Sequence, residues 1–289
     1  MKVLVTGAGG QVGRALLRSA PADWSVVAVA HNELDITALA AVSAAVNRLR
    51  PSVIINAAAY TAVDRAESEP EQARVCNVTG PQNLATVAAG NGIRLVHLST
   101  DFVFDGASSK PYEPHDATSP LSIYGQTKRD GELAVRAELG ERATILRTAW
   151  VYSADGGNFL KTMLRLMKER GSVRVVGDQI GTPTAAHSLA AAVWQIVRQE
   201  SLGGIFHWTD AGVASWYDFA VAIAEEAACS GQLSAPVSVV PISTSEYPTP
   251  ARRPRFSVLD CSTARHATGI QPQHWRENVR QVLTELRCA

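Results

Sequence analysis

The N-terminal segment constrains the fold more than any other part of the chain. Residues 2–6 have the apolar, β-branched character of a short buried strand, a loop with Gly7, Gly10 and Gly13 follows, and residues 14–17 have the character of a helix. Glycines in such a loop allow a tight turn and a close approach to a pyrophosphate, which faces the helix N-terminus. The spacing is G-x-x-G-x-x-G, and glycine runs also occur in plain turns, so the motif alone is a weak indication of a dinucleotide site.

Predicted strands alternate with predicted helices along the first half of the chain, and this pattern is typical of a doubly wound parallel sheet. We therefore predict an α/β fold, a doubly wound parallel sheet (Rossmann-like) with a smaller C-terminal substrate-binding domain. The further strands are predicted at residues 25–30, 53–55, 95–98, 143–146, 173–176 and 205–208. The helices are predicted at about 38–50, 71–78, 81–91, 158–170, 186–199, 215–229 and 275–287.

The predicted domain division follows this order of elements. Residues 1–150 and about 183–208 form the predicted NAD(P)-binding domain, and about 151–182 and 209–289 form the predicted substrate-binding domain. The Pro/Ser-rich segment 234–250 is predicted to be part of the smaller domain or a lid.

The composition excludes several classes of function. Among 289 residues, 46% are hydrophobic and 19% are charged, which is enough apolar content for a sizeable core. The formal net charge is zero, so no broad field attracts nucleic acid or an anionic membrane. No apolar run reaches membrane-spanning length, and the N-terminus does not resemble a signal peptide. The cysteines lack a C-x-x-C spacing, so we predict reduced thiols, no metal site and a cytoplasmic protein: Cys76, Cys229, Cys261 and Cys288.

Three side chains form the candidate catalytic group. The predicted strand 95–98 leads to Thr100, and Tyr124 and Lys128 are four residues apart on a predicted helix, where they share one face. Reduction of a carbonyl by hydride leaves negative charge on oxygen, which needs a donor in the transition state. A phenol titrates near ~10, and a nearby ammonium is expected to lower that value. The pattern favours a nicotinamide-dependent ketone reductase, and the alternative is an ordinary pair on a surface helix.

The tip of the second predicted strand bears on the choice of cofactor. NAD-specific sites usually place an acid there to hold the ribose 2′-hydroxyl, whereas this chain has Ala30, His31 and Asn32. These residues would not repel a 2′-phosphate, so NADPH is the preferred cofactor and NADH is the second choice. Asp35 is expected under the adenine, or alternatively as the N-cap of a helix that begins at Ile36.

Other residues are candidates for the walls of the site. Ala57, Ala58, Ala59 and Tyr60 follow a strand, where small residues let a cofactor lie against the sheet edge or let a helix pack closely. Trp150 follows a later strand and is either a flat wall against the substrate or a core residue. Three guanidiniums gather at Arg252, Arg253 and Arg255, a cluster that suits a diphosphate, with a solvated turn as the alternative.

These residues together carry a resemblance to a known family. The chain resembles the extended short-chain dehydrogenase/reductase superfamily and, within it, the dTDP-4-dehydrorhamnose reductases. The resemblance covers nearly the whole chain, and its segments are 7–13, 34–37, 56–64, 66–70, 99–106, 124–128, 147–152, 181–184, Arg253-Pro254 and Ser257.

The resemblance implies reduction of the C4 ketone of dTDP-6-deoxy-L-lyxo-4-hexulose to dTDP-L-rhamnose with NAD(P)H. Tyr124 would donate the proton, Lys128 would tune Tyr124 and hold the nicotinamide ribose, and Thr100 would bind the reacting oxygen. Asp101 and Trp150 would contact the sugar, and Arg253 completes the predicted substrate site. The expected cofactor-binding residues also include Gly7, Gly10, Gln11, Val12, Gly13, Asp35, Ile36, Ala57, Ala58, Ala59 and Tyr60.

The resemblance also bears on metals and assembly. Some family members are described with a magnesium ion held by glutamates at a dimer interface. The matching positions hold Ala15 and His187 here, which argues against a metal-bridged dimer. The expected partner is a nucleotide-sugar substrate, and the chain is expected to be a monomer or a homodimer.

Two alternatives to this reductase remain. The first is another nucleotide-sugar enzyme, a reductase, dehydratase or epimerase; similar dehydratases have Asp-Glu directly after the threonine, whereas Phe102 follows Asp101 here. The second is a cofactor-binding regulatory subunit that resembles the one of methionine adenosyltransferase. Turnover of a sugar ketone distinguishes an enzyme from such a subunit.

Overall fold

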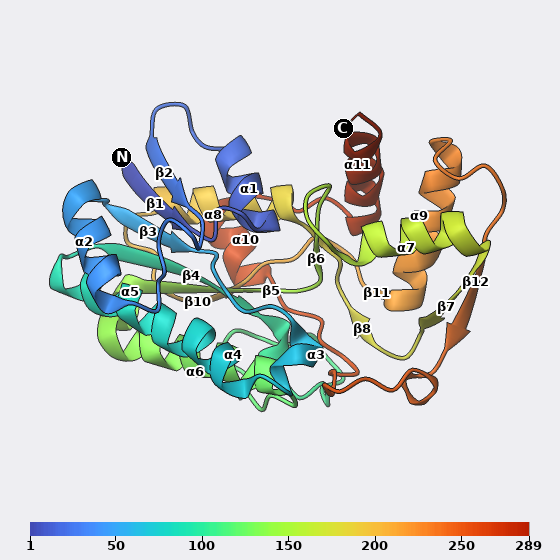
Figure 1. Cartoon of the computed structure of the whole chain (residues 1–289), viewed down its shortest axis with the longest axis horizontal. Coiled ribbons are helices and arrows are strands. Elements are labelled where there is room, and N and C mark those ends of the chain that lie inside the picture. Colours follow the sequence, from blue (N-terminus) through green and yellow to red (C-terminus); the bar gives the residue numbers. More distant parts are fainter. Residues whose placement is uncertain (289) are drawn as a thin grey trace.

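A six-stranded parallel sheet forms the centre of the larger part of the molecule (Figure 1). The computed structural model describes residues 1–288. The sheet order is β10-β5-β4-β3-β1-β2. The chain adds β2 on one side of β1 and the later strands on the other side, and this reversal of strand order confirms the predicted doubly wound fold. The strands are β1 (Lys2–Thr6), β2 (Ser25–Val29), β3 (Val53–Asn56), β4 (Arg94–Thr100), β5 (Ala143–Thr148) and β10 (Gly204–His207).

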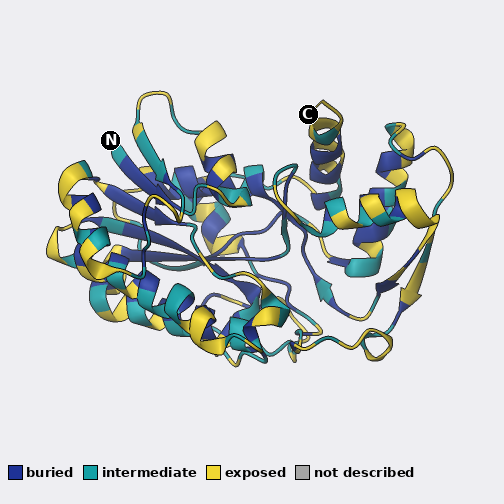
Figure 2. Ribbon diagram, viewed as in Figure 1, coloured by how far each residue is buried: buried dark blue, intermediate teal, exposed yellow. Residues whose placement is uncertain are grey.

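Helices cover both faces of this sheet because its strands are apolar on both sides. Val3 and Val5 of β1 pack in one cluster, while Leu4 between them packs in the other. In Figure 2 the inner strands of the sheet are accordingly buried along almost their whole length, whereas the edge strands β2 and β10 are mostly of intermediate burial. One face is covered by α1 (Gln11–Arg18), α8 (Ala186–Arg198) and α10 (Ser262–Thr268), and the other by α2 (Leu39–Leu49), α5 (Gly80–Gly90) and α6 (Ile123–Leu139).

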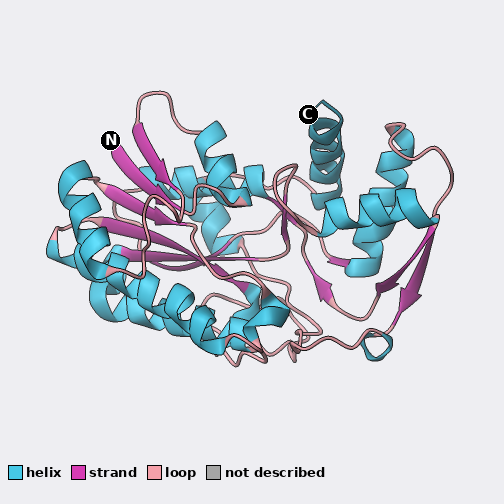
Figure 3. Ribbon diagram, in the orientation of Figure 1, coloured by secondary structure: helices cyan, strands magenta, loops and turns pink. Residues whose placement is uncertain are grey.

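A second, smaller part has its own core and lies on the right in Figure 3. Its main elements are α7 (Phe159–Arg170), β7 (Ser172–Val176), α9 (Trp216–Cys229), β12 (Ser238–Ile242) and α11 (Trp275–Cys288). Short strand pairs join it to the larger part: β6 (Val151–Tyr152) with β9 (Thr184–Ala185), and β8 (Ile180–Gly181) with β11 (Ala214–Ser215). The strand β12 lies within the Pro/Ser-rich segment, where the sequence predicted no strand, and pairs with β7.

The connection between β3 and β4 also differs from the prediction. It contains α3 (Val63–Ala66), α4 (Pro70–Arg74) and a π-helical turn, η1 (Val75–Thr79), which runs directly into α5. The two helices predicted here are therefore one nearly continuous run. The short 3₁₀ turns are η2 (Asp101–Val103), η3 (Gly140–Arg142) and η4 (Thr244–Glu246).

The chain returns to the larger part before it ends. The predicted division assigns 209–289 to the smaller domain, but α10 packs on α8 and β10, and Ala264 belongs to the core of the larger part. The division itself stays a prediction. Within residues 1–288, no helix combines the length and the hydropathy that crossing a bilayer requires.

Candidate active site

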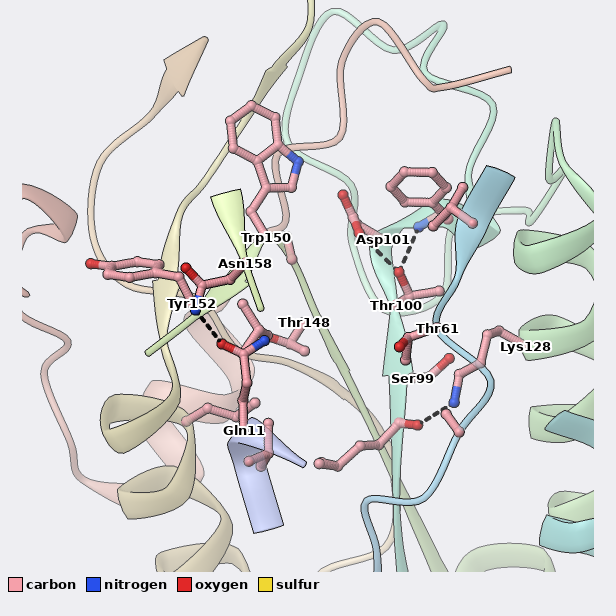
Figure 4. Close-up of a pocket in the computed structure, with 18 of the residues that line it drawn as sticks. Gln11, Thr61, Ser99, Thr100, Asp101, Lys128, Thr148, Trp150, Tyr152 and Asn158 are labelled. Carbon is pink, nitrogen blue, oxygen red and sulfur yellow. Dashed lines mark hydrogen bonds between the residues drawn. The ribbon is translucent and has the colours of Figure 1, made fainter. Parts of the chain in front are cut away.

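A cavity of about 570 Å³ opens at the carboxyl ends of the central strands, between the two parts (Figure 4). This is where an open parallel sheet usually binds its ligand. The predicted residues that line it are Gly10, Gln11, Val12, Ala57, Ala59, Thr100, Asp101, Tyr124, Lys128, Trp150 and Arg253. The predicted residues outside its lining are Gly7, Gly13, Asp35, Ile36, Ala58 and Tyr60.

Tyr124 lies in the first turn of α6, which is held against the end of β4. Ser122 caps the helix by accepting a hydrogen bond from the Gly125 N–H at 3.2 Å. A Cβ on Gly125 would lie 2.2 Å from the carbonyl oxygen of Phe102, so only glycine permits this approach. The Phe102 ring packs edge-on against Tyr124 with centroids 5.6 Å apart. The phenol is thereby brought beside Thr100.

The titration of Tyr124 differs from the sequence-based expectation. Burial raises the pKa of the phenol to about 12, and the nearby Asp101 also raises it, while a hydrogen bond with Thr100 opposes these effects. Lys128 was expected to lower the pKa of Tyr124. In the protein without bound cofactor that expectation is wrong, because the pKa is raised. The physical reason is that desolvation disfavours the phenolate more than the neighbouring groups favour it.

Lys128 is buried one turn further along α6, and its ammonium is held by the backbone. Its Nζ donates to the Leu98 carbonyl oxygen at 2.7 Å. Burial lowers the pKa of Lys128 to about 8, and the charge of Glu132 opposes this shift. An ammonium with a lowered pKa at this place can exchange a proton near neutral pH.

A buried ion pair lies beneath Lys128. Glu132 and Arg147 have side chains 4% and 3% exposed and approach to 2.7 Å, and the Ser99 hydroxyl also donates to Glu132. This pair joins α6 to β5 one helical turn beyond Lys128. The sequence reasoning did not single out Glu132, although its position four residues after Lys128 puts it on the same helix face.

Asp101 is buried beside Ser257 and Thr100, and the hydroxyls of both residues oppose the effect of burial on the pKa of its carboxyl. Oδ1 accepts from the Thr100 hydroxyl at 3.0 Å, while Oδ2 has no hydrogen-bond partner among the described residues. Burial raises the pKa of Asp101 to about 6. A buried oxygen without a partner at the wall of a cavity is suited to a ligand hydroxyl. Thr148, at the paired position on β5, likewise has an unpartnered hydroxyl in the cavity wall, although it was not among the predicted site residues.

The glycine loop fits closely between β1 and β3. Gly7 has φ +76°, and a Cβ on it would lie 2.6 Å from the Ala57 backbone. A Cβ on Gly13 would lie 2.2 Å from the carbonyl oxygen of Gly7. These two glycines shape the loop, whereas Gly10 faces the cavity and precedes α1, whose first turn has no side-chain cap. Backbone N–H groups at such a helix start are suited to an anion.

The other predicted cofactor residues fall into two groups. Ala57 and Ala59 face the cavity, while Ala58 packs against the core. Tyr60 lies outside the lining, and its hydroxyl donates to Glu69 at 2.6 Å. Asp35 accepts from both the N–H and the hydroxyl of Thr37, so it shapes a turn. It does not cap α2, which begins at Leu39, so that alternative is wrong. Ile36 is buried in the core.

Trp150 forms an aromatic wall at the substrate side of the cavity. Its ring stacks on Trp216 with centroids 3.5 Å apart and planes 7° from parallel. Its backbone has φ 46°, a left-handed conformation that is costly for a side chain of this size. A Cβ on Gly181 would lie 2.7 Å from the indole, so a glycine is needed opposite it. Trp216 was not predicted, because nothing in the sequence places α9 against Trp150.

Arg253 lines the cavity, but its guanidinium already has a partner. It forms a two-pronged ion pair with Asp64 at 2.8 Å and 3.1 Å, which ties the 243–257 segment to α3. The pair lowers the pKa of Asp64. Arg252 and Arg255 are exposed and do not line the cavity, so the predicted triple cluster does not converge on one site.

The two positions discussed for magnesium are placed as follows. Ala15 is buried in the core, and His187 Nε2 lies 3.2 Å from Asn278 Oδ1. Within residues 1–288, no group of three or more His, Cys, Asp or Glu side chains is arranged to hold a metal.

A doubly wound sheet with Thr100 at a strand end and the Tyr124–Lys128 pair on the following helix defines a short-chain dehydrogenase/reductase. The family model described as RmlD substrate binding domain matches residues 1–288, and the chain belongs to this family. The predicted resemblance to the dTDP-4-dehydrorhamnose reductases is thereby confirmed.

The chain is similar over its whole length to named reductases. It is 42% identical to the dTDP-4-dehydrorhamnose reductase of Sinorhizobium fredii, covering 99% of this chain and 98% of that protein. It superposes with a TM-score of 0.93 on that of Clostridium acetobutylicum, at 40% identity and with 99% and 100% of the two chains covered. The reductase of Bacillus anthracis, solved in complex with NADP, has a TM-score of 0.92 at 35% identity, with 98% and 99% covered.

Proposed function

We propose that this protein reduces the C4 ketone of dTDP-6-deoxy-L-lyxo-4-hexulose to dTDP-L-rhamnose with NADPH. The observation that carries the proposal is the convergence of Tyr124, Thr100 and Lys128 at one wall of a cavity that also reaches the glycine loop. The similarity to dTDP-4-dehydrorhamnose reductases over the whole chain supports this substrate class.

The residues around the cavity fit a dinucleotide cofactor. The uncapped first turn of α1 suits the diphosphate, and the exposed backbone at Ala57 and Ala59 leaves room beside the strand ends. The complex of the Bacillus anthracis reductase with NADP supports this assignment. When it is bound, NADPH supplies the hydride for the ketone carbon.

The preference for NADPH rests on the tip of β2. His31 and Asn32 are exposed there and carry no negative charge to oppose a 2′-phosphate. Two acids lie nearby: Glu33 accepts from the Ala30 N–H at 2.8 Å, and Asp35 accepts from Thr37. We expect kcat/KM to be higher with NADPH than with NADH, and Glu33→Gln to raise that ratio by about two- to fivefold because a like charge is removed. A wild-type preference for NADH would contradict this reading of the strand tip.

The protein residues have distinct tasks in the reduction. Tyr124 donates its proton to the ketone oxygen as negative charge develops on it, and its high pKa keeps the phenol protonated at neutral pH. When the ketone binds, the Thr100 hydroxyl turns its single proton from Asp101 Oδ1 to the same oxygen and so stabilises the charge. Lys128, held at the Leu98 carbonyl, anchors the nicotinamide ribose and supplies positive charge below the site.

The remaining lining residues position the sugar. The unpartnered oxygen of Asp101 accepts a hydrogen bond from a sugar hydroxyl. The Trp150 ring offers a flat apolar surface to the sugar ring. Arg253, fixed by Asp64, lies at the cavity wall where its remaining N–H groups can meet the diphosphate of the substrate.

The proposed function is tested by following the nicotinamide absorbance. The assay contains the purified protein, NADPH and dTDP-6-deoxy-L-lyxo-4-hexulose, made in situ by a dehydratase and an epimerase. We expect NADPH oxidation that depends on the epimerase and yields dTDP-L-rhamnose. Oxidation without the epimerase would instead assign a different sugar substrate, and NADPH binding without turnover would favour a regulatory subunit.

A further inference from the structure

The side chain of Gln11 is held by a loop from the opposite side of the cavity. Gln11 is the first residue of α1, and its Oε1 accepts hydrogen bonds from Asn158 Nδ2 at 2.9 Å and Ser153 Oγ at 3.0 Å. Both donors belong to the segment between β6 and α7. Figure 4 shows the Oε1 of Gln11 turned toward Asn158 and the Nε2 turned toward the centre of the cavity.

The orientation of this carboxamide follows from the capping of α7. Asn158 is the N-cap residue, and its Oδ1 accepts from the Lys161 N–H at 3.1 Å. Its Nδ2 must therefore point the other way, where it donates to Gln11 Oε1 and to the Ser153 carbonyl oxygen. An amide nitrogen can only donate, so the oxygen of Gln11 must face Asn158. The N–H groups of Gln11 are left for the cavity.

The loop that carries Asn158 is fastened to α1 at further points. Asp155 forms ion pairs with Arg18 at 2.5 Å and with Arg14 at 3.8 Å. The two arginines are four residues apart on α1 and therefore share one face of that helix. Gly156 has φ +63°, and a Cβ on it would lie 3.6 Å from Gln11 Cγ. These contacts hold the loop against the start of α1, where Asn158 meets Gln11.

We propose that Asn158 is a positioning residue that acts through Gln11. It fixes the Gln11 carboxamide so that two N–H donors at the start of α1 are available to an oxygen of the diphosphate of NADPH. Without Asn158 the carboxamide oxygen keeps only the Ser153 hydroxyl as a donor, and that hydroxyl is shared with the Asp155 carbonyl oxygen. The nitrogen of Gln11 then faces the anion less consistently. This inference rests on the proposed function, because it takes NADPH as the ligand of the cavity.

The test is a titration of the free protein with NADPH, without any sugar substrate. Asn158→Ser keeps an N-cap oxygen but removes the amide donor, and Gln11→Ala removes the carboxamide. We expect each to raise the Kd for NADPH by about five- to tenfold, as for the loss of one hydrogen bond of ordinary strength. The double variant is expected to match Gln11→Ala, since Asn158 has no effect without its target.

A matched control separates this role from helix capping. Ser215 caps α9 through Asp218 and lies outside the cavity lining, so Ser215→Ala is expected to lower the melting temperature without changing the Kd. If Asn158→Ser does not fold, Asn158→Asp, which keeps the capping acceptor, takes its place. The inference would be overturned if Asn158→Ser left the Kd for NADPH unchanged. It would also be overturned if the increase in Kd of the double variant equalled the product of the increases of the two single variants. Tight NADPH binding without sugar turnover would overturn the proposed function and leave this inference standing.

Discussion

At the residue scale, the buried carboxylate of Asp101 lowers the stability of the folded protein at neutral pH. Its carboxyl is 1% exposed and has one unpartnered oxygen, and its pKa rises from 3.8 to about 6. The folded protein therefore binds more protons at this group than the unfolded chain does between about pH 4 and 6. The contribution of Asp101 to stability falls as the pH rises through this window and stays low above it.

Replacing Asp101 by asparagine removes this dependence. We expect the free energy of unfolding of Asp101→Asn, relative to wild type, to rise by about 2 kcal/mol between pH 4 and 7, measured by urea denaturation. Asp105 in the same loop is the matched control, because its pKa is lowered by the Ala107 N–H and the Tyr112 hydroxyl. The relative stability of Asp105→Asn is expected to change in the opposite direction. A difference for Asp101→Asn that is independent of pH would contradict the account.

Lys128 gives the second pH prediction. Its pKa is lowered to about 8, so its ammonium is lost as the pH rises through that value. We expect kcat/KM for the hexulose to fall above about pH 8, because the neutral amine no longer supplies positive charge below the nicotinamide ribose. The measurement is a pH–rate profile at saturating NADPH. A profile that stays flat up to pH 10 would show that the charge on Lys128 is not required.

The sequence predicted which residues meet in the cavity better than it predicted their electrostatics. Tyr124, Lys128 and Thr100 followed from spacing, because spacing determines which residues share a helix face or a sheet edge. The pKa of Tyr124 depends on how much of the phenol is desolvated, and desolvation depends on Phe102 and the rest of the wall. Glu132 was missed for a similar reason, since its partner Arg147 comes from another strand.

At the scale of elements, the 243–257 segment is the connection that the sequence described least well. It leaves β12, crosses toward the larger part in Figure 1, and is tied to α3 by Arg253 and Asp64. It overlaps the Pro/Ser-rich segment 234–250, which was predicted to be part of the smaller domain or a lid. That segment also contains β12, whose pairing with β7 depends on a strand far away in the sequence. Local composition does not contain such long-range pairing information.

Arg253 allows a test of this segment. Arg253→Lys keeps the charge but loses the two-pronged geometry toward Asp64 and the diphosphate. We expect KM for the nucleotide sugar to rise by about tenfold, with little change in the Kd for NADPH. Arg252→Lys on the exposed neighbour is the control and is expected to leave both constants unchanged. Equal effects of the two substitutions would remove Arg253 from the substrate site.

At the scale of the whole molecule, the cavity exists because two parts with separate cores meet at the strand ends. The parallel sheet and its helices followed from the alternation of apolar runs, which is a local signal. The wall formed by Trp150 and Trp216, and the fastening of the 153–158 loop to α1, join elements from both parts. Such contacts depend on how the parts dock, and no local pattern in the sequence determines that.

In the proposed reaction, Tyr124 donates the proton that completes reduction of the sugar ketone. The most direct measurement is kcat for Tyr124→Phe with NADPH and dTDP-6-deoxy-L-lyxo-4-hexulose, beside the Kd for NADPH of the same variant. The account predicts that kcat falls by about 10²- to 10⁴-fold, because the general acid is removed, while the Kd changes less than about threefold. A variant that binds NADPH normally and retains most of its kcat would contradict the account.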